Sequence, residues 1–266
     1  MDQNTSVVPD MSSFGRRNGL NSTYDGCCFM KFPSPLIRGT LLQRYKRFLF
    51  DARLDDGSTV TGTCANTGSL LGLKEAGTPI WMSETDSPTR KYRHTWEMCE
   101  VDLGGGPALV GINTSHPNKL VAEAIEGGRI KELKGYATLR REVKYGKNSR
   151  IDLLLEDPKK GLAYVEIKNV HFMRAAGMAE FPDSVTERGA KHLVEMSDMV
   201  REGHRAVMVY LIQRSDAKRL TLARDVDPKY GAAYDAAMAA GVECLAYSCT
   251  MSPEEIVVEK RVPMKG

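Results

Sequence analysis

Short runs of alternating hydrophobic and polar residues fill the chain from residue 36 to about residue 112. They lie at 41–54, 58–64, 79–83, 94–102 and 108–112, and polar or glycine-rich turns separate them. Alternation with a period of two, bounded by Gly, Asp and Asn, is typical of β-strands. Several short strands in one small region predict a barrel. The OB-like barrel is the form most often linked to nucleic acids.

The pattern changes to mixed helix and strand after residue 113. Helical periodicity appears at 119–126 and 185–202, whereas apolar, strand-like runs lie at 137–145, 150–156, 162–168, 206–212 and 242–247. Alternating strands and helices predict an α/β or α+β sheet domain. Residues 1–30 are polar and lack periodicity, so we expect a disordered N-terminal extension and Met30 as the biological start. The predicted division is 1–30 for this extension, 31–112 for the barrel and 113–266 for the mixed-sheet domain.

Composition places the chain among ordinary soluble globular proteins. It has 266 residues, of which 42% are hydrophobic and 27% charged, and its formal net charge is +3. That net charge does not by itself predict nucleic-acid binding. Positive charge is concentrated locally, however, because residues 129–150 contain eight Lys or Arg residues and two acids.

The cysteines and the apolar runs exclude two further classes of protein. The six cysteines form no Cys-x-x-Cys pair, and no His stands at zinc-finger spacing from them, so structural zinc is not expected. No apolar run reaches the roughly 18 residues of a membrane span. We therefore expect a protein of the cytoplasm, or one associated with the nucleoid, with no membrane partner.

A hairpin centred on Lys159 carries the main candidate chemistry. Two apolar runs, 149–155 and 162–168, flank its turn. In a symmetric antiparallel pair Asp152 faces Glu166, with Cβ atoms about 4.5–5.5 Å apart. Two carboxylates so close repel each other unless a cation lies between them, and Mg²⁺ or Mn²⁺ prefers such oxygen ligands. The pairing therefore predicts phosphodiester chemistry with a divalent metal held by Asp152 and Glu166.

Lys168 is the third candidate catalytic residue. A strand places Glu166 and Lys168 on one face and Ile167 on the other. Lys168 would orient the attacking water or offset charge on the phosphorane, while the metal polarises the phosphoryl oxygen. In the alternative interpretation, Arg150, Asp152, Glu166 and Lys168 form an ion network on an exposed hairpin. The apolar neighbours along both strands favour the buried site.

Asp152 followed by Glu166-Ile167-Lys168 resembles the motif of the PD-(D/E)xK nuclease superfamily. The element order also matches that core, with a helix, three strands and a second helix from 119 to 202. The resemblance implies a further acid from the first helix, for which Glu123 is the candidate. Glu142, at a strand beside the hairpin, would add another metal ligand or form an ion pair with a neighbouring basic residue.

Longer blocks are similar to the bacterial sugar fermentation stimulation protein A (SfsA) family, from about Met30 to the C-terminus. The family implies an N-terminal OB-like β-barrel, a C-terminal PD-(D/E)xK nuclease-like mixed-sheet domain and DNA binding. Its name reports a sugar-metabolism phenotype and is no guide to chemistry. Ala65 replaces the proline usual at that position. The blocks are Gln43–Phe48, Asn66–Gly68, Arg90–Glu97, Glu142–Gly146, Ser149–Asp152, Val165–Lys168 and Phe181–Leu193.

Basic residues near aromatic residues or near the hairpin are the candidates for nucleic-acid contacts. On a strand, Tyr45 and Arg47 would share one face, and Lys46 and Phe48 the other. A helix face with Arg188, Lys191, His192 and Glu195 at i, i+3, i+4 and i+7 is either solvated or in contact with phosphate. The full set is Arg44, Tyr45, Lys46, Arg47, Lys91, Arg93, Lys144, Arg150, Arg188 and Lys191.

The sequence therefore predicts a DNA-binding protein with a Mg²⁺- or Mn²⁺-dependent nuclease site. Asp152, Glu166 and Lys168 are the expected catalytic residues, and Glu123 and Glu142 are additional candidate metal ligands. One alternative is a regulator of sugar-metabolism genes that binds DNA without cutting it. Another is a protein directed at RNA, for which an OB-like barrel is equally suited.

Overall fold

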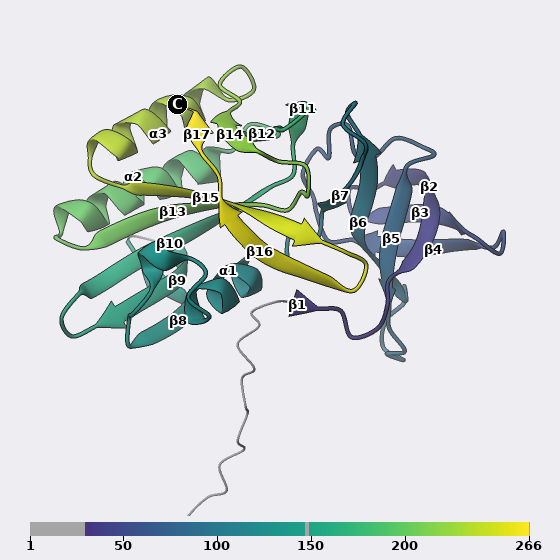
Figure 1. Cartoon of the computed structure of the whole chain (residues 1–266), viewed down its shortest axis with the longest axis horizontal. Coiled ribbons are helices and arrows are strands. Elements are labelled where there is room, and N and C mark those ends of the chain that lie inside the picture. Colours follow the sequence, from purple (N-terminus) through teal and green to yellow (C-terminus); the bar gives the residue numbers. More distant parts are fainter. Residues whose placement is uncertain (1–29, 147–148, 266) are drawn as a thin grey trace, which may run out of the picture.

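The structure is a computed structural model that describes residues 30–146 and 149–265. Within these residues the chain forms a barrel and a larger domain built on a seven-stranded sheet, with a small four-stranded sheet beside it (Figure 1). Of the disordered extension expected at residues 1–30, residues 1–29 lie outside the described residues, whereas Met30 belongs to a strand, β1 (Met30–Lys31). In the described ranges, no helix is long and apolar enough to cross a membrane.

Five strands close the barrel. Their order along the wall is β4-β3-β2-β5-β6, and β6 pairs in parallel with β4 to complete the ring. The interior is filled by fully buried side chains that include Leu41, Phe50, Ile80, Met82 and Trp96. Closure removes the sheet edges and confirms the predicted OB-like barrel. The strands are β2 (Ile37–Tyr45), β3 (Leu49–Leu54), β4 (Thr59–Cys64), β5 (Pro79–Glu84) and β6 (His94–Asp102). A further strand, β7 (Pro107–Gly111), pairs with the second half of β6 on the side away from β5.

The single strand expected at 41–54 is a hairpin instead. It turns at Lys46 and Arg47, whose φ angles of 48° and 63° lie in the left-handed region. The Arg44 guanidinium stabilises this turn by donating to the Arg47 carbonyl at 2.7 Å. The expected alternation from Tyr45 to Phe48 is therefore wrong, because Lys46, Arg47 and Phe48 are all exposed at the turn. The sequence has no Gly or Pro there to indicate a turn.

A seven-stranded mixed sheet forms the centre of the second domain. Its order is β1-β16-β15-β13-β10-β9-β8, and β10, β13 and β15 run parallel to one another. Helix α1 covers one face, and α2 and α3 cover the other (Figure 1). Both faces are therefore buried, as the apolar run at 206–212 predicts. The elements are α1 (Pro117–Glu126), a 3₁₀ turn (Lys131–Leu133), β8 (Thr138–Tyr145), β9 (Ser149–Asp157), β10 (Gly161–Val170), α2 (Glu187–Arg201), β13 (Arg205–Ile212), α3 (Pro228–Ala239), β15 (Glu243–Met251) and β16 (Glu255–Arg261).

The four-stranded sheet was not predicted, because its strands are only two to four residues long. It has the order β11-β12-β14-β17. These strands are β11 (Met173–Ala175), β12 (Met178–Phe181), β14 (Arg219–Leu222) and β17 (Met264–Lys265).

The two domains are joined by backbone contacts as well as by the chain itself. Strand β1 (Met30–Lys31) pairs with β16, so Lys31, which we expected to open the barrel domain, lies in the C-terminal sheet. On another side, the Gly111 amide donates to the Gln213 carbonyl at 2.8 Å. In the second domain the order α1, β8, β9, β10, α2 is the one expected of a nuclease-like core. The predicted fold class is thus confirmed.

Candidate metal centre

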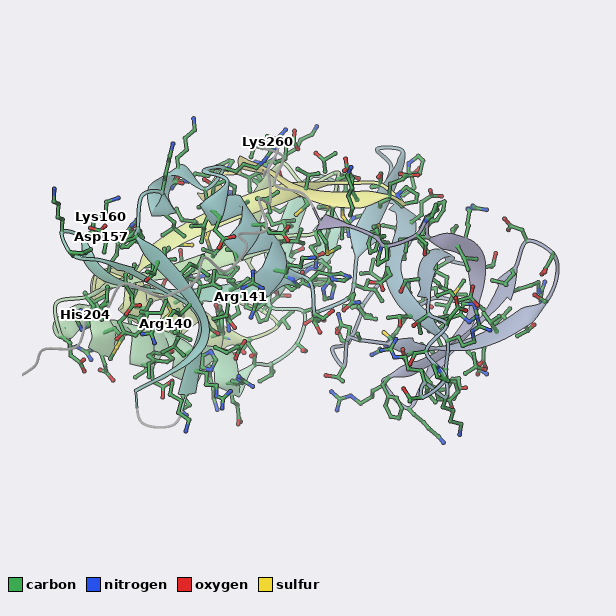
Figure 2. All side chains as sticks on the ribbon, turned by 90° about the horizontal axis from the view of Figure 1, so that it is seen from below. Arg140, Arg141, Asp157, Lys160, His204 and Lys260 are labelled. Carbon is green, nitrogen blue, oxygen red and sulfur yellow. The ribbon has the colours of Figure 1, made fainter. Side chains whose placement is uncertain are left out.

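The β9–β10 hairpin has the register that a turn centred on Lys159 predicts. Backbone pairing runs from Gly161 opposite Asp157 to Val165 opposite Leu153. The regular ladder ends there, one residue short of Asp152 on β9 and Glu166 on β10. Here the Asp152 carboxylate, rather than a backbone carbonyl, accepts the next hydrogen bond, from the Ile167 amide to Oδ2 at 2.7 Å. The turn itself lies at the end of the C-terminal domain away from the barrel, where Figure 2 shows Asp157 and Lys160.

Asp152 occupies a break in the alternation of β9. Ile151 and Leu153, which flank it, are buried in the hydrophobic clusters on opposite faces of the sheet, although a regular strand would direct both to one face. On the neighbouring strand β8, Glu142 lies between the residues paired with Ile151 and Leu153, and its φ of 53° is in the left-handed region. Both strands are therefore irregular at the same point. The irregularity turns the Asp152 side chain along the sheet toward β10.

Glu166 is 2% exposed and is held from two sides. Its Oε1 atom accepts a hydrogen bond from Lys168 Nζ at 2.6 Å and another from His192 Nδ1 on α2. Ile167 belongs to the cluster on the opposite face, so the predicted placement of Glu166 and Lys168 on one face is confirmed. In the part of the chain that the structure describes, the second oxygen, Oε2, is buried without a hydrogen-bond partner.

His192 contacts Glu166 and Arg188 through different ring nitrogens. Arg188 Nε donates toward His192 Nε2 at 3.3 Å, and the tautomer that accepts there carries its proton on Nδ1, which faces Glu166. The sequence placed His192 on a helix face together with charged residues. The structure divides that face, because His192 and Glu195 are buried whereas Arg188 and Lys191 are exposed.

The negative charge of Glu166 disfavours the ionisation of Asp152, so the pKa values of the two acids shift in opposite directions. Burial, followed by the charge of Glu166, raises the pKa of Asp152 to about 6, against the opposing hydrogen bonds from Ile167 and Asn118. Burial would also raise the pKa of Glu166, but the His192 hydrogen bond and the Lys168 charge more than offset it and lower that pKa. A bound cation would relieve the repulsion.

The two acids fit a hard divalent cation. Glu166 presents an unpartnered buried oxygen, and Asp152 is destabilised by the neighbouring negative charge. Among residues 30–146 and 149–265, no group of three or more acidic, His or Cys side chains is arranged as a complete metal site. Two carboxylates are enough for Mg²⁺, which usually retains several waters and takes ligands from substrate phosphates.

Asn118 of α1 contacts Asp152 and Glu142. Its amide donates to Asp152 Oδ1 at 2.9 Å and to Glu142 Oε1 at 3.2 Å. Glu123, the acid expected from this helix, lies 3.7 Å from Lys119 Nζ, and its other oxygen is buried with no partner in the described residues. Sequence reasoning missed Asn118 because it searched for acids. Its position one residue after Pro117, at the start of the helix, is the signal that was available.

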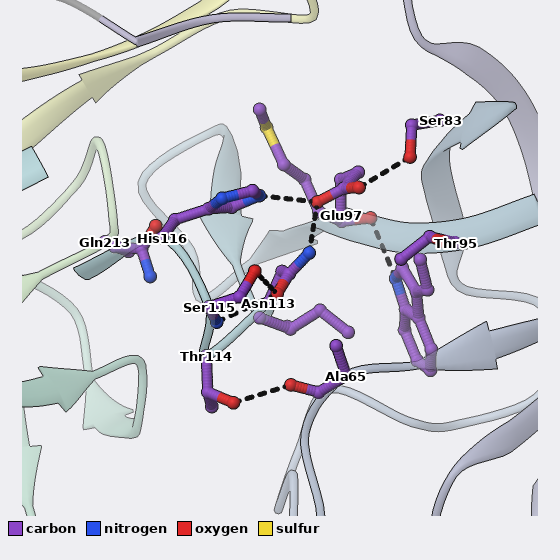
Figure 3. A network of polar contacts seen from close by, with 12 residues as sticks. Ala65, Ser83, Thr95, Glu97, Asn113, Thr114, Ser115, His116 and Gln213 are labelled. Atoms are coloured by element: carbon purple, nitrogen blue, oxygen red, sulfur yellow. Dashed lines mark hydrogen bonds and ion pairs between the residues drawn. The ribbon is translucent and has the colours of Figure 1, made fainter. Parts of the chain in front are cut away.

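A network of buried polar groups fixes the start of α1 against the barrel (Figure 3). Glu97 of β6 accepts from Ser83 at 2.6 Å and from Asn113 at 2.7 Å. His116 Nε2, two residues before Asn118, lies 2.7 Å from Glu97 Oε2. These hydrogen bonds and the His116 contact lower the pKa of Glu97 although burial acts in the opposite direction. The barrel therefore helps to position the residue that contacts Asp152.

Predicted nucleic-acid residues of the second domain lie beside the acids. A hollow of about 430 Å³ is lined by Glu142, Ser149, Arg150, Arg188, Lys191 and His192. It brings together three of the predicted basic residues from β9 and α2, next to the histidine that contacts Glu166. Lys144 lies across from Arg150 in the β8–β9 pair.

Most of the predicted basic residues of the barrel already form hydrogen bonds or ion pairs within the protein. Arg44 donates to the carbonyls of Asn66 and Gly68, and Arg47 donates to that of Thr67. Among the other candidates, Tyr45 donates to Asp51, Arg93 pairs with Glu84 and Asp86, and Lys91 lies 5.4 Å from the centre of the Tyr92 ring. Lys46 remains exposed at the turn. The structure thus separates these residues from the hollow beside the acids.

Comparisons with known proteins cover both domains. The family model described as the SfsA N-terminal OB domain matches residues 42–112, and that of the sugar fermentation stimulation protein RE domain matches residues 115–255. The sugar fermentation stimulation protein homologue of Rhizobium meliloti is 59% identical over 228 residues, which are 86% of this chain and 94% of that protein. The homologue of Rhodospirillum centenum is 54% identical over 237 residues, 89% of this chain and 100% of that protein.

A solved structure gives the same result for the whole fold. The structure of Pyrococcus furiosus SfsA in complex with Ca²⁺ matches with a TM-score of 0.79 and 26% identity, covering 89% of this chain and 98% of that one. Together with the two domain matches and the relatives above 50% identity, this confirms the resemblance of the sequence blocks. The chain belongs to the sugar fermentation stimulation protein (SfsA) family.

Proposed function

We propose that this protein is a nuclease that hydrolyses phosphodiester bonds of DNA with Mg²⁺ or Mn²⁺ held by Asp152 and Glu166. The observation that carries the proposal is the unpartnered, buried Oε2 of Glu166 beside a second carboxylate whose pKa is raised to about 6. Perturbed acids with a specific charge partner are typical of functional sites. When bound, the metal would polarise a phosphate oxygen and stabilise charge in the transition state.

The residues of this chain have separate tasks in that reaction. Lys168 and His192 hold Oε1 of Glu166, which leaves Oε2 directed to the cation. Lys168, whose side chain is 14% exposed, would also place a positive charge where the attacking water is oriented. Arg150, Arg188 and Lys191, around the 430 Å³ hollow, would bind the phosphates on either side of the scissile bond.

Two comparisons support the proposal of a metal-dependent nuclease. A family member, Pyrococcus furiosus SfsA, was solved in complex with Ca²⁺, which like Mg²⁺ prefers oxygen ligands. The family model that matches residues 115–255 is described as an RE domain. DNA is the proposed partner because the cationic hollow lies beside the acids, and such a hollow attracts the phosphate backbone.

One observation favours a second candidate function, a regulator that binds DNA without cutting it: the description of the matching family refers to sugar fermentation and not to cleavage of DNA. Such a protein would use the basic hollow for binding and would take up no cation at Asp152 and Glu166.

The experiment that tests the proposal is Glu166→Gln in the full chain, assayed on matched single-stranded DNA, duplex DNA and RNA with Mg²⁺ and with Mn²⁺. We expect metal-dependent cleavage by the wild type and at least a hundredfold loss in the variant, because one metal ligand and one charge are removed. Glu156→Gln is the matched control, since Glu156 lies on the same hairpin and pairs with Arg140 at the surface. The nuclease proposal fails if the wild type does not cleave or if Glu166→Gln cleaves as well as Glu156→Gln. Calorimetry with Mn²⁺ then distinguishes the regulator from the nuclease, because the regulator would bind no cation at Asp152 and Glu166.

A further inference from the structure

Tyr145, the last residue of β8, has a buried hydroxyl that no part of the proposed mechanism uses. The side chain is 7% exposed, and its ring packs against Tyr164 with 5.7 Å between centroids. Among the residues that the structure describes, its hydroxyl oxygen has no hydrogen-bond partner. Buried hydroxyls are nearly always paired, so an unpaired one in a folded protein requires an explanation.

The surroundings of this hydroxyl are acidic. The charges of Glu166, Glu195 and Asp152 all act on the phenol of Tyr145. Gly146, the next residue, lies next to α2, where a Cβ atom on it would be in ordinary contact with Glu195 Oε1 at 3.4 Å. Glu195, like Glu166, has an Oε2 atom that is buried and unpartnered in the described part of the chain. One phenol donor and two carboxylate oxygens are thus left unsatisfied in one neighbourhood.

Phosphate is the ligand class that fits the donor among these groups. A cation satisfies carboxylates but cannot accept a hydrogen bond from a phenol, whereas a phosphate oxygen accepts hydrogen bonds and binds cations. Tyr145 lines a hollow of about 740 Å³ together with Lys144, Lys191 and Glu195. Lys191 also lines the 430 Å³ hollow. The two hollows therefore share Lys191, whose ammonium group would bind the phosphate backbone.

We propose that Tyr145 is a further catalytic residue of this site, whose hydroxyl donates a hydrogen bond to a non-bridging oxygen of the bound phosphodiester. This inference rests on the proposed function and names the group that contacts the substrate beside the metal. Burial, and then the neighbouring carboxylates, raise the pKa of Tyr145, so the phenol remains a donor at neutral pH. A fixed donor of this kind lowers the barrier by stabilising charge that develops on the phosphate oxygens.

The test is Tyr145→Phe in the full-length protein, compared with Tyr164→Phe, which removes the hydroxyl of the neighbouring ring. With Mg²⁺ we expect the rate of DNA cleavage to fall about tenfold to a hundredfold in Tyr145→Phe and to stay unchanged in Tyr164→Phe. In Ca²⁺, the affinity for a fluorescent oligonucleotide should fall about tenfold in Tyr145→Phe, measured by anisotropy. Calorimetric affinity for Mn²⁺ alone should be unchanged, because the metal ligands remain.

The melting temperature of Tyr145→Phe distinguishes a catalytic role of the hydroxyl from a structural one. Removal of an unpaired buried hydroxyl should leave the melting temperature of the metal-free protein equal or higher, whereas a structural hydroxyl would lower it on removal. Equal cleavage and equal binding by wild type and Tyr145→Phe would overturn the inference while the nuclease proposal stands. If the wild type never cleaves but Tyr145→Phe loses Ca²⁺-dependent binding, the nuclease proposal fails and the phosphate contact of Tyr145 is retained.

Discussion

Replacement of Asp152 by asparagine is expected to stabilise the metal-free protein at neutral pH. Asp152 lies beside Glu166 in a partly buried position, and its pKa is raised from 3.8 to about 6, first by burial and then by that neighbouring charge. A difference of about two pKa units between the folded and unfolded states corresponds to about 3 kcal/mol. Asparagine removes the charge and keeps an oxygen to accept the hydrogen bond from the Ile167 amide. Its NH₂ group replaces the oxygen that accepts from Asn118, so the carboxamide of Asn118 must rotate to present its own oxygen there.

The sign of the effect depends on pH. Below about pH 4 the carboxyl is protonated in both states, so the charge costs nothing and the variant gains nothing. As the pH rises to 6, the unfolded chain releases its proton while the folded protein still holds it, so the wild type loses stability. Above about pH 6 the loss is complete. The advantage of Asp152→Asn should therefore grow from near zero at pH 4 to its full value at pH 7.

Thermal unfolding in the presence of EDTA measures this difference. For a protein of this size about 3 kcal/mol corresponds to about 6–12 °C in melting temperature. Addition of Mn²⁺ should then raise the melting temperature of the wild type, by about 2.7 kcal/mol at a hundred times the dissociation constant, and leave Asp152→Asn unchanged. The reasoning is refuted if the variant melts below the wild type at pH 7 in EDTA, or if its advantage is the same at pH 4.

Two further predictions concern the hollow and the domain junction. Lys191→Ala and Arg150→Ala should each reduce the slope of log affinity against log salt by about one for duplex DNA, measured by anisotropy, whereas Lys160→Ala at the distant hairpin turn should not. Glu97→Ala leaves the buried Asn113 and the partly buried His116 without their carboxylate partner, so urea unfolding should show a loss of about 3 kcal/mol or more. Glu100→Ala on the same strand is the control, and an equal effect of the two would contradict the role of the network.

The central hairpin could be predicted because its signals are local. Two apolar runs around a turn fix the register as far as Val165 opposite Leu153, and this register brings Asp152 and Glu166 to the end of the regular pairing. The face shared by Glu166 and Lys168 follows from the period of two in the same way. The presence of a barrel was likewise predicted, since short strands and turns recur at close spacing. Its strand order was not predicted, because the parallel pairing of β4 with β6 joins residues about 30 positions apart.

The rest of the site depends on contacts that no local pattern contains. The direction of Asp152 follows from a break in the alternation, which coincides with a left-handed Glu142 on the neighbouring strand. Asn118 and His192 reach the acids from helices on opposite faces of the sheet. The turn at Lys46 and Arg47 was missed for a similar reason, because side-chain hydrogen bonds to carbonyls, not Gly or Pro, stabilise it.

The two domains contribute to one site rather than acting as independent modules. Glu97 belongs to a barrel strand, yet it holds His116, and His116 is the residue from which α1 begins. Asn118, two residues later, donates to both Asp152 and Glu142, and its hydrogen bond lowers the pKa of Asp152 against the stronger effect of burial. A shift of the barrel would therefore move the start of α1 and change how readily Asp152 releases its proton.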